Sequence, residues 1–460
     1  MPHPPPPTGE RDRRDAPPHG APARGWRERA LEALLAPDER RFVVAALIAA
    51  LLLRLAALAL AAATGQVQIH WDEIYVAQHM VAGRGYEFNY YGIFHDPDRP
   101  SAFFPPAYVF NVYLLLRVFH SELAVAFENV LLSVGVAAAL YALARRLFDS
   151  LTARVALLMS VVYPPFIARV PQGVNVYPRL LLMVLMVLAL QRLWSGRRVV
   201  DAVLGGLWAG LLALMLPDAL IYVLLFALAG LVAPARWRPG WRPVAATVAT
   251  ALLVIAPWTL RNWIRFHEFC PISTNGGFMF YMGYHDRATQ EVDFDCLTDL
   301  DRRLGGELTR ADEVRRSAIL YREGLRWMLR EPRQAALNML ARVGLHWSFR
   351  PSNVKDMGLM SGRTAMGGWG FRLYIWSYAI SYLIVLGLAL PGFLRCHRRW
   401  GELTPIWLAF VYSTVVAALF VVQTKMRLIK VDPFLLLFAA CFAAERLRAR
   451  IAPRAPEAPA

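Results

Sequence analysis

Charged residues are scarce in this sequence, and lysine is almost absent. Only 18% of the 460 residues are charged, whereas 57% are hydrophobic and the mean hydropathy is +0.36. This composition excludes an ordinary soluble globular protein and indicates a protein that crosses the membrane several times. Lysine occurs only at positions 355, 425 and 430, so the net charge of +16 comes almost entirely from arginine.

The arginines occur in short clusters between apolar runs. A net charge of +16 would suit a nucleic-acid-binding protein, but such proteins carry their basic residues along one face of a soluble domain. Clusters between membrane spans are topology signals instead, because basic residues collect on the cytoplasmic side. We therefore expect no nucleic-acid partner and a multi-pass protein of the inner, or plasma, membrane.

Cysteine is also rare. The four cysteines, at positions 270, 296, 396 and 441, form no Cys-x-x-Cys pair and have no histidine at a spacing typical of zinc sites. The sequence therefore predicts no cysteine–metal site. Cys270 and Cys296 fall in one predicted outer region, where an oxidising compartment would permit a disulfide. Whether it forms depends on geometry that spacing does not give.

Apolar runs long enough to cross a bilayer, roughly 20 residues, recur along the chain. A further run at 104–119 opens with Pro105 and Pro106. If this run crossed the membrane, the arginine clusters would fall outside, against the positive-inside rule; if it does not, they fall inside. We therefore predict an all-α polytopic membrane protein with about ten transmembrane helices and an interfacial or re-entrant helix at 104–119. The predicted spans lie near 42–63, 122–143, 152–169, 177–193, 199–216, 219–234, 243–259, 371–394, 402–422 and 428–444.

This topology places two large segments on the outer side of the membrane. The first residues are rich in proline and arginine and lack the apolar core of a signal peptide, so we expect a disordered cytoplasmic tail. The second outer segment is more polar and has helical patterns near 311–330 and 334–347. The predicted parts are a tail at 1–40, an N-terminal transmembrane catalytic module at 41–260 with a first outer loop at 64–121, a mostly helical outer region at 261–370, C-terminal transmembrane helices at 371–445 and a cytoplasmic tail at 446–460.

A pair of acidic residues, Asp72 and Glu73, follows closely on the first apolar run. Carboxylates are expensive in hydrocarbon, so two of them at the membrane edge indicate a functional site. A structural alternative is that the pair caps the helix that continues from Ile74 to Val81, since acidic residues stabilise helix N-termini. Both descriptions can hold, one for each residue.

Four segments of the chain, taken in order, resemble those of a known group of membrane enzymes. They lie at 72–75 with 83–86, at 104–108, at 256–262 with 273–277, and at 425–427 with 431–434. In these segments the sequence is similar to polyprenyl-phosphate-sugar-dependent glycosyltransferases, the superfamily of the protein O-mannosyltransferases and the lipid A aminoarabinose transferase. The resemblance implies a C-type glycosyltransferase fold and a sugar donor carried on a polyprenyl phosphate, undecaprenyl phosphate in a bacterium.

The implied reaction gives the acidic pair a chemical role. Transfer of the sugar passes through an oxocarbenium-like transition state while the acceptor hydroxyl loses its proton, so a base is needed near the anomeric carbon. We predict that Asp72 is this base and that Glu73 assists or orients it, on the periplasmic or extracellular face. The sugar, the acceptor (a lipid, a glycan or a protein) and the oligomeric state are left open; membrane lipids are the other expected partners.

The phosphate of the carrier requires cations, and arginine can pair two phosphate oxygens at once. Lys425, Arg427 and Lys430 fall at an outer membrane edge, where topology alone disfavours basic residues. For each single arginine, snorkelling to lipid headgroups is an equal alternative. The other predicted substrate-binding residues are His70, Tyr75, Arg169, Arg179, Arg261 and Asn262.

The short outer loop before Arg179 departs from the superfamily pattern. Related enzymes usually carry a second acid there, whereas this loop holds Asn175 and no carboxylate. A divalent metal cofactor is left open, because Asp72 and Glu73, with His70 or Asn175, offer few hard oxygen ligands. Two other functions also stay open: a lipid or glycan transporter, and a non-catalytic protein that binds the same carrier.

Two glycines follow Asn275 at the start of the second outer region. Glycine gives the backbone freedom, so this stretch predicts a loop that admits a long lipid at the membrane face. An equal alternative is a simple turn into the outer region.

Overall fold

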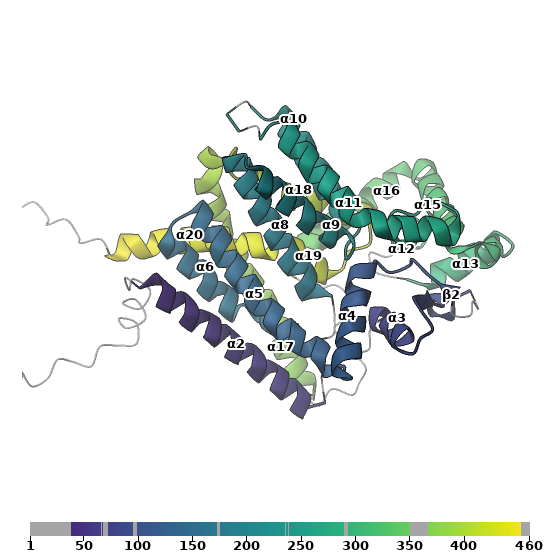
Figure 1. The fold of residues 1–460 in the computed structure, drawn as a ribbon, viewed down its shortest axis with the longest axis horizontal. Helices are drawn as coiled ribbons and strands as arrows, with labels where there is room; N and C mark the ends of the chain where they lie inside the picture. The colour runs from purple at the N-terminus through teal and green to yellow at the C-terminus, as the bar shows by residue number, and fades with distance from the viewer. Residues whose placement is uncertain are drawn as a thin grey trace, which may run out of the picture.

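The described chain is almost entirely helical (Figure 1). The computed structural model describes residues 38–451 apart from 66, 68–71, 95–98, 173–174, 235, 238, 289–292 and 350–366. The predicted N-terminal tail lies outside this range except for its last residues. At the other end of the chain, helix α20 (Asp432–Ile451) continues beyond the predicted boundary at 445.

Helices cover the predicted apolar runs, although the runs at 152–169 and 428–444 are each divided between two helices, so the all-α membrane fold is confirmed. Among the described residues, five helices are long and apolar enough to cross a membrane, and others are shorter than a bilayer requires. The number of ten spans therefore stays a prediction. The long helices are α2 (Glu39–Ala63), α5 (Leu123–Leu147), α8 (Val176–Gly196), α11 (Trp241–Phe266) and α17 (Gly367–Arg395), which continues into η3 (Cys396–Arg399). The shorter apolar helices are α4 (Pro106–Phe119), α6 (Ser150–Val162), α9 (Val199–Ala213), α10 (Ala219–Val232) and α18 (Thr404–Leu419).

The helix predicted at 104–119 is present as α4. It begins at Pro106, where a proline is tolerated because the first helical N–H groups have no intrahelical partner. Its 14 residues span about 21 Å, less than the roughly 30 Å of the hydrocarbon core. This length does not separate an interfacial or re-entrant helix from a span, because α10, which covers the predicted span at 219–234, also has 14 residues. The position of α4 at the membrane stays a prediction.

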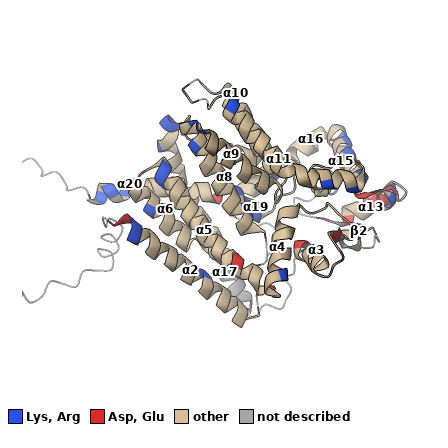
Figure 2. Cartoon of the chain, in the orientation of Figure 1, with Lys and Arg blue, Asp and Glu red and all other residues tan. Residues whose placement is uncertain are grey.

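The predicted cytoplasmic arginine clusters gather at one end of the helical bundle. Glu39, at the start of α2, accepts hydrogen bonds of 2.6 Å from both Tyr141 and Ser150, and it pairs with Arg145 at 3.2 Å. Arg399 donates to the carbonyl of Leu147 at 2.8 Å, which brings η3 to the same place. Figure 2 shows basic residues concentrated at this end, where both ends of the described chain lie.

A buried arginine closes the end of α6. Pro164 begins the next helix, α7 (Pro164–Ala168), and α6 therefore ends with carbonyl groups that have no intrahelical donor. Arg54 of α2 is fully buried and donates to the carbonyls of Ser160 at 2.9 Å and Val161 at 2.8 Å. This arginine, costly in an apolar interior, is explained by its structural role.

Helices α9 and α11 pack closely through glycines of α9. A Cβ atom at Gly206 would collide with the backbone oxygen of Thr247, and one at Gly210 would lie 2.7 Å from the Cβ of Val254. Small residues four apart let two helices approach in this way.

Gly206→Ala should therefore lower the free energy of unfolding by about 1–3 kcal/mol, because α9 and α11 must separate. The measurement is thermal or denaturant unfolding in detergent. Gly344→Ala is the matched control, since a Cβ at that helical position meets nothing within 4 Å. Equal stability of both variants would contradict the close packing.

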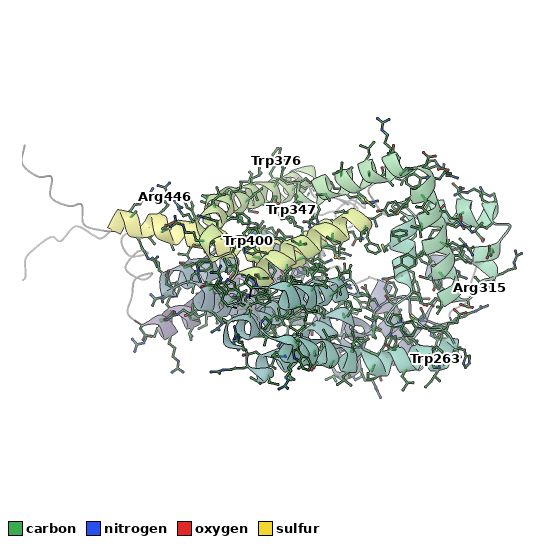
Figure 3. The ribbon with its side chains drawn as sticks, turned by 90° about the horizontal axis from the view of Figure 1, so that it is seen from above. Trp263, Arg315, Trp347, Trp376, Trp400 and Arg446 are labelled. Atoms are coloured by element: carbon green, nitrogen blue, oxygen red, sulfur yellow. The ribbon has the colours of Figure 1, made fainter. Side chains whose placement is uncertain are left out.

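The two predicted outer segments pack together at the opposite end of the molecule. Thr274 donates its backbone N–H to the carbonyl of Ala102 at 3.0 Å, and the rings of Phe103 and Phe278 meet edge to face at 4.9 Å. Figure 3 shows Arg315 of this part and Arg446 of α20 at opposite ends of the molecule. The first segment holds α3 (Asp72–Val81), the antiparallel strands β1 (Glu87–Phe88) and β2 (Arg99–Pro100), and η1 (Tyr90–Gly92). The second holds α12 (Asn275–Tyr281), α13 (Asp295–Arg303), α14 (Glu307–Arg310), α15 (Glu313–Arg330) and α16 (Pro332–Trp347).

All four cysteines are free thiols. Cys270 and Cys296, for which a disulfide is permitted by the predicted compartment, are both buried and make no such bond. Burial raises the pKa of each of these two thiols to about 12.

Candidate active site

The acidic pair lies at the beginning of α3, which packs against α4. Asp72 is the first residue of this helix, and its side chain lies outside the described part of the chain, as does the whole of His70. The Glu73 side chain is only 14% exposed. A buried carboxylate needs partners, and the structure supplies two.

Both partners of Glu73 come from the start of α8. Asn175, which directly precedes α8, donates its amide N–H to Glu73 Oε1, and Arg179 Nη2 lies 3.8 Å from the same oxygen. The Arg179 side chain is 7% exposed. A carboxylate at this position also benefits from the positive end of the α8 dipole.

A second carboxylate, Asp218, belongs to the same cluster. It directly precedes α10 and accepts hydrogen bonds from Lys430 Nζ at 2.6 Å and from the Tyr412 hydroxyl at 2.7 Å. Lys430 is the last residue of α19 (Thr424–Lys430), and its ammonium group lies 4.6 Å from the centre of the Tyr412 ring. Because Lys430 is buried, the carboxylate of Asp218 supplies the counter-charge that its ammonium group needs.

Arg179 links the two carboxylates. Its guanidinium interacts electrostatically with Glu73 most strongly and with Asp218 next. Two acids are thus balanced by two cations, Arg179 and Lys430. We name this group the acid–base cluster; its members are Glu73, Asn175, Arg179, Asp218, Tyr412 and Lys430.

Two polar atoms of the acid–base cluster have no hydrogen-bond partner within the described part of the chain. Asn175 Oδ1, an acceptor, and Arg179 Nε, a donor, are both buried from solvent. Buried polar atoms are nearly always hydrogen-bonded in folded proteins, so such atoms call for an explanation. A polar ligand that offers both a hydroxyl and an anionic oxygen would satisfy both.

Arg427, predicted to bind substrate, makes a different set of contacts. It pairs with Asp432 at 3.1 Å, donates to the Ser348 carbonyl and to the Tyr378 hydroxyl, and stacks 3.5 Å from the centre of the Tyr382 ring. These contacts join α17, α19 and α20. They favour a packing role, because binding a phosphate would require Arg427 to give up some of them.

Arg261 and Asn262, at the outer end of α11, connect the outer segments to the bundle. Arg261 donates to the Ser101 carbonyl at 2.8 Å. Asn262 is fully buried and donates to the carbonyls of Cys270 at 3.1 Å and Ile272 at 3.2 Å. The structure does not bring either residue into the acid–base cluster: Arg261 holds the first outer segment, and Asn262 holds the loop that follows α11.

The remaining predicted binding residues make contacts of their own. Arg169 is buried and donates to Gln172 at 2.8 Å, and its Nε has no hydrogen-bond partner among the described residues. The ring of Tyr75 is 36% exposed and lies 4.2 Å from the ring of His79. Lys425 is partly exposed in the first turn of α19. None of these contacts tests the predicted role.

A buried glutamate ties the second outer segment to the first. Glu313, at the start of α15, accepts hydrogen bonds from the backbone N–H of Ala102 at 2.8 Å and from the Thr274 hydroxyl at 2.6 Å. Its burial raises the pKa of the carboxyl above the ordinary value of 4.5, although these hydrogen bonds oppose the shift. The protonated form is therefore favoured in the folded protein relative to the unfolded chain.

This shift predicts a pH dependence of stability. Because the folded pKa is raised, the contribution of Glu313 is fully present below pH 4.5 and is lost as the pH rises through the folded pKa. In Glu313→Gln this loss should disappear. As the pH rises, the free energy of unfolding of the wild type should therefore fall relative to that of the variant by at most about 1.4 kcal/mol per pH unit. Unfolding would be followed across this pH range, with the exposed Glu331→Gln as control. Identical pH profiles for Glu313→Gln and the wild type would contradict the shift.

The described side chains of the acid–base cluster do not fit a hard divalent cation. Such an ion takes about six oxygen ligands. Glu73 and Asn175 offer oxygens, but the Arg179 guanidinium lies 3.8 Å from Glu73, and Lys430 already neutralises Asp218. We therefore derive no step that uses a metal at this place.

Sequence reasoning missed two members of the cluster. Asp218 stands between the apolar runs at 199–216 and 219–234, and an acid between two spans is a signal of function that was available. Tyr412 lies within an apolar run, where a tyrosine is ordinary, so no signal marked it. Among the predicted residues, the structure brings together Glu73, Arg179 and Lys430.

Comparison with solved structures identifies the fold. An oligosaccharyltransferase of Archaeoglobus fulgidus, tethered with an acceptor peptide containing the NVT sequon, aligns with a TM-score of 0.51 and 14% identity over 89% of this chain and 50% of that one. The oligosaccharyltransferase AglB of that organism, in complex with an inhibitory peptide and a dolichol-phosphate, has a TM-score of 0.48 and 15% identity. That alignment covers 91% of this chain and 52% of that one. A complex of the A. fulgidus enzyme with Zn and sulfate has a TM-score of 0.49 and 16% identity, over 88% of this chain and 50% of that one.

The first of these likenesses shows a shared fold, and the chain spans about half the length of the structures it matches. No protein-family model and no curated protein matches the sequence. At an identity of 14% this likeness bears on the fold alone and does not test the predicted superfamily. The narrower resemblance to protein O-mannosyltransferases and the lipid A aminoarabinose transferase stays a prediction.

Proposed function

We propose that this protein transfers a sugar from a polyprenyl-phosphate donor to an acceptor at the outer face of the membrane. The observation that carries the proposal is the acid–base cluster, with its buried and unsatisfied Asn175 Oδ1 and Arg179 Nε. A sugar phosphate contains hydroxyl donors and anionic acceptors, and these complement the two atoms. The likeness of the fold to an oligosaccharyltransferase adds support.

In the proposed reaction the acceptor hydroxyl oxygen attacks the anomeric carbon. The bond from this carbon to the phosphate oxygen breaks, and the polyprenyl phosphate leaves with the electron pair. Asp72 takes the proton of the acceptor hydroxyl, so that proton and charge both balance. The carboxylate is regenerated when the proton passes to water.

Arg179 is the proposed partner of the leaving phosphate. A guanidinium can pair two phosphate oxygens and stabilises the charge that grows as the bond breaks. Glu73 and Asn175 act as positioning residues, because their contacts at the start of α8 hold Arg179 and α3 together. Lys430 is less suited to the phosphate, because it is paired with Asp218.

The test is the affinity of the purified protein for a polyprenyl phosphate and for the polyprenol of the same length. We expect the wild type to prefer the phosphate. Arg179→Met should lose about 1.5–3 kcal/mol of this preference, roughly 10- to 150-fold in affinity, and Arg179→Lys should retain part of it.

The matched control is Arg117→Met, which removes an exposed arginine from α4. It should bind both lipids as the wild type does. An Arg179→Met variant with an unchanged preference for the phosphate would place the carrier elsewhere and overturn this part of the proposal.

A further inference from the structure

Three side chains with metal-binding atoms meet in the second outer segment, at the connection between α12 and α13. His285 lies in the turn after α12, Asp293 stands two residues before α13, and Cys296 is the second residue of α13. One ligand atom from each lies within 4.8 Å of the others. Figure 2 shows acidic residues gathered at α13.

Local hydrogen bonds account for two of these residues but not for the third. Asp293 Oδ1 accepts a hydrogen bond of 2.9 Å from the backbone N–H of Asp295, and the Cys296 thiol donates to the Asp293 carbonyl at 3.1 Å. His285 is only 6% exposed, and its Nε2 is buried with no hydrogen-bond partner among the residues that the structure describes. A buried histidine beside a thiol and a carboxylate therefore lacks a structural explanation.

The chemistry of the three donors selects the kind of ion. Hard cations such as Mg²⁺ and Ca²⁺ prefer sets of oxygen ligands, whereas imidazole nitrogen with thiolate sulfur suits Zn²⁺. In tetrahedral zinc sites the metal–ligand distances of about 2.0–2.3 Å place neighbouring ligand atoms roughly 3.3–3.8 Å apart. Ligand atoms within 4.8 Å reach this arrangement through shifts of about 1 Å.

The surroundings hold the three residues in place. The ring of His285 stacks on Tyr281 at 5.6 Å, and the Tyr281 hydroxyl accepts a hydrogen bond of 2.8 Å from Arg303 of α13. The neighbouring Asp286 is engaged by the indole N–H of Trp327 at 2.7 Å and by Arg330 at 3.1 Å. Asp286 is thus committed to α15 and is not needed as a ligand.

We propose that His285, Asp293 and Cys296 bind a zinc-type transition metal, with water as the fourth ligand. The ion joins the turn after α12 to the start of α13 and so stabilises the outer segment. This site is carried by other elements than the acid–base cluster, so it does not depend on the proposed sugar transfer. Sequence spacing missed it, because a histidine and a cysteine separated by ten residues match no zinc motif.

The experiment uses the purified full-length protein in detergent, with Co²⁺ as a spectroscopic substitute for Zn²⁺. We expect a single tightly bound ion per chain and a cobalt–thiolate charge-transfer absorption, which requires a coordinated cysteine. Cys296→Ser should abolish this absorption. Loss of a residue that hydrogen-bonds to a metal ligand weakens metal binding roughly 10- to 100-fold. Cys296→Ser should weaken Zn²⁺ binding by more than this.

Cys270→Ser is the matched control, because Cys270 is also buried in the second outer segment but lies outside the cluster. It should retain the absorption. His285→Ala and Asp293→Asn should each weaken binding, and Zn²⁺ should raise the Tm of the wild type and of Cys270→Ser but not that of Cys296→Ser. The absence of the absorption from the wild type, or its persistence in Cys296→Ser, would overturn the proposal.

Discussion

Asp72→Asn should abolish most sugar transfer while leaving carrier binding intact. We expect the rate of donor consumption to fall on the order of 10²–10⁴-fold, because an amide cannot accept the proton of the acceptor hydroxyl. Affinity for the polyprenyl phosphate should change little, since the proposed phosphate partner is Arg179. The measurement compares release of polyprenyl phosphate from its sugar conjugate with binding of the free carrier, using membranes that lack the native protein as the source of acceptor.

Glu87→Gln provides the control for this prediction. Glu87 is an acid of the same outer segment, in β1, outside the acid–base cluster. It should retain wild-type turnover. Full turnover by Asp72→Asn would instead show that another group is the base, and an equal loss in both variants would point to damage to the outer segment.

Asp218→Asn should strongly destabilise the protein. Lys430 is 1% exposed, and removal of its carboxylate would leave a buried ammonium group without a counter-charge. Loss of one partner from a buried pair costs about 3–5 kcal/mol, whereas replacing both partners is much better tolerated. The double variant Asp218→Asn with Lys430→Met should therefore recover much of the stability, as measured by unfolding in detergent.

Glu445→Gln is the control, because Glu445 and Arg395 form a pair at 3.0 Å with both side chains about half exposed. Its cost should be about 0–1 kcal/mol. A strictly additive loss in the Asp218 and Lys430 double variant would contradict the coupling between them.

The helices and their order could be predicted from the sequence because apolar runs are local signals. The runs at 104–119 and 334–347 became helices α4 and α16, and the arginine clusters lie together at one end. Spans are harder to count, since α6 ends at Val162, two residues before Pro164, and is shorter than a bilayer requires.

The candidate site was only partly predictable because it is assembled from distant segments. Glu73 and Arg179 were predicted from their own surroundings, but their contact depends on how α3 meets the start of α8. Asp218 joins them only through the fold, from the turn before α10. No local pattern encodes these distances.

The glycines after Asn275 illustrate a different limit. Both predictions, a loop that admits a lipid and a simple turn, were wrong, because this stretch forms α12. A Cβ at Gly277 would collide with the backbone oxygen of Ser317, so the glycine serves close packing of α12 on α15. Glycine occurs both where the backbone needs conformational freedom and where a side chain would not fit, and the sequence does not distinguish these two reasons.

The most direct measurement is transfer of a labelled sugar from a polyprenyl phosphate by the purified protein in membranes that supply the acceptor. We predict a labelled acceptor and free polyprenyl phosphate in equal amounts with the wild type, and neither above background with Asp72→Asn. Carrier binding by the wild type without any transferred sugar would contradict the proposed enzyme and favour a non-catalytic carrier-binding protein. Movement of the intact donor across the membrane would favour a transporter.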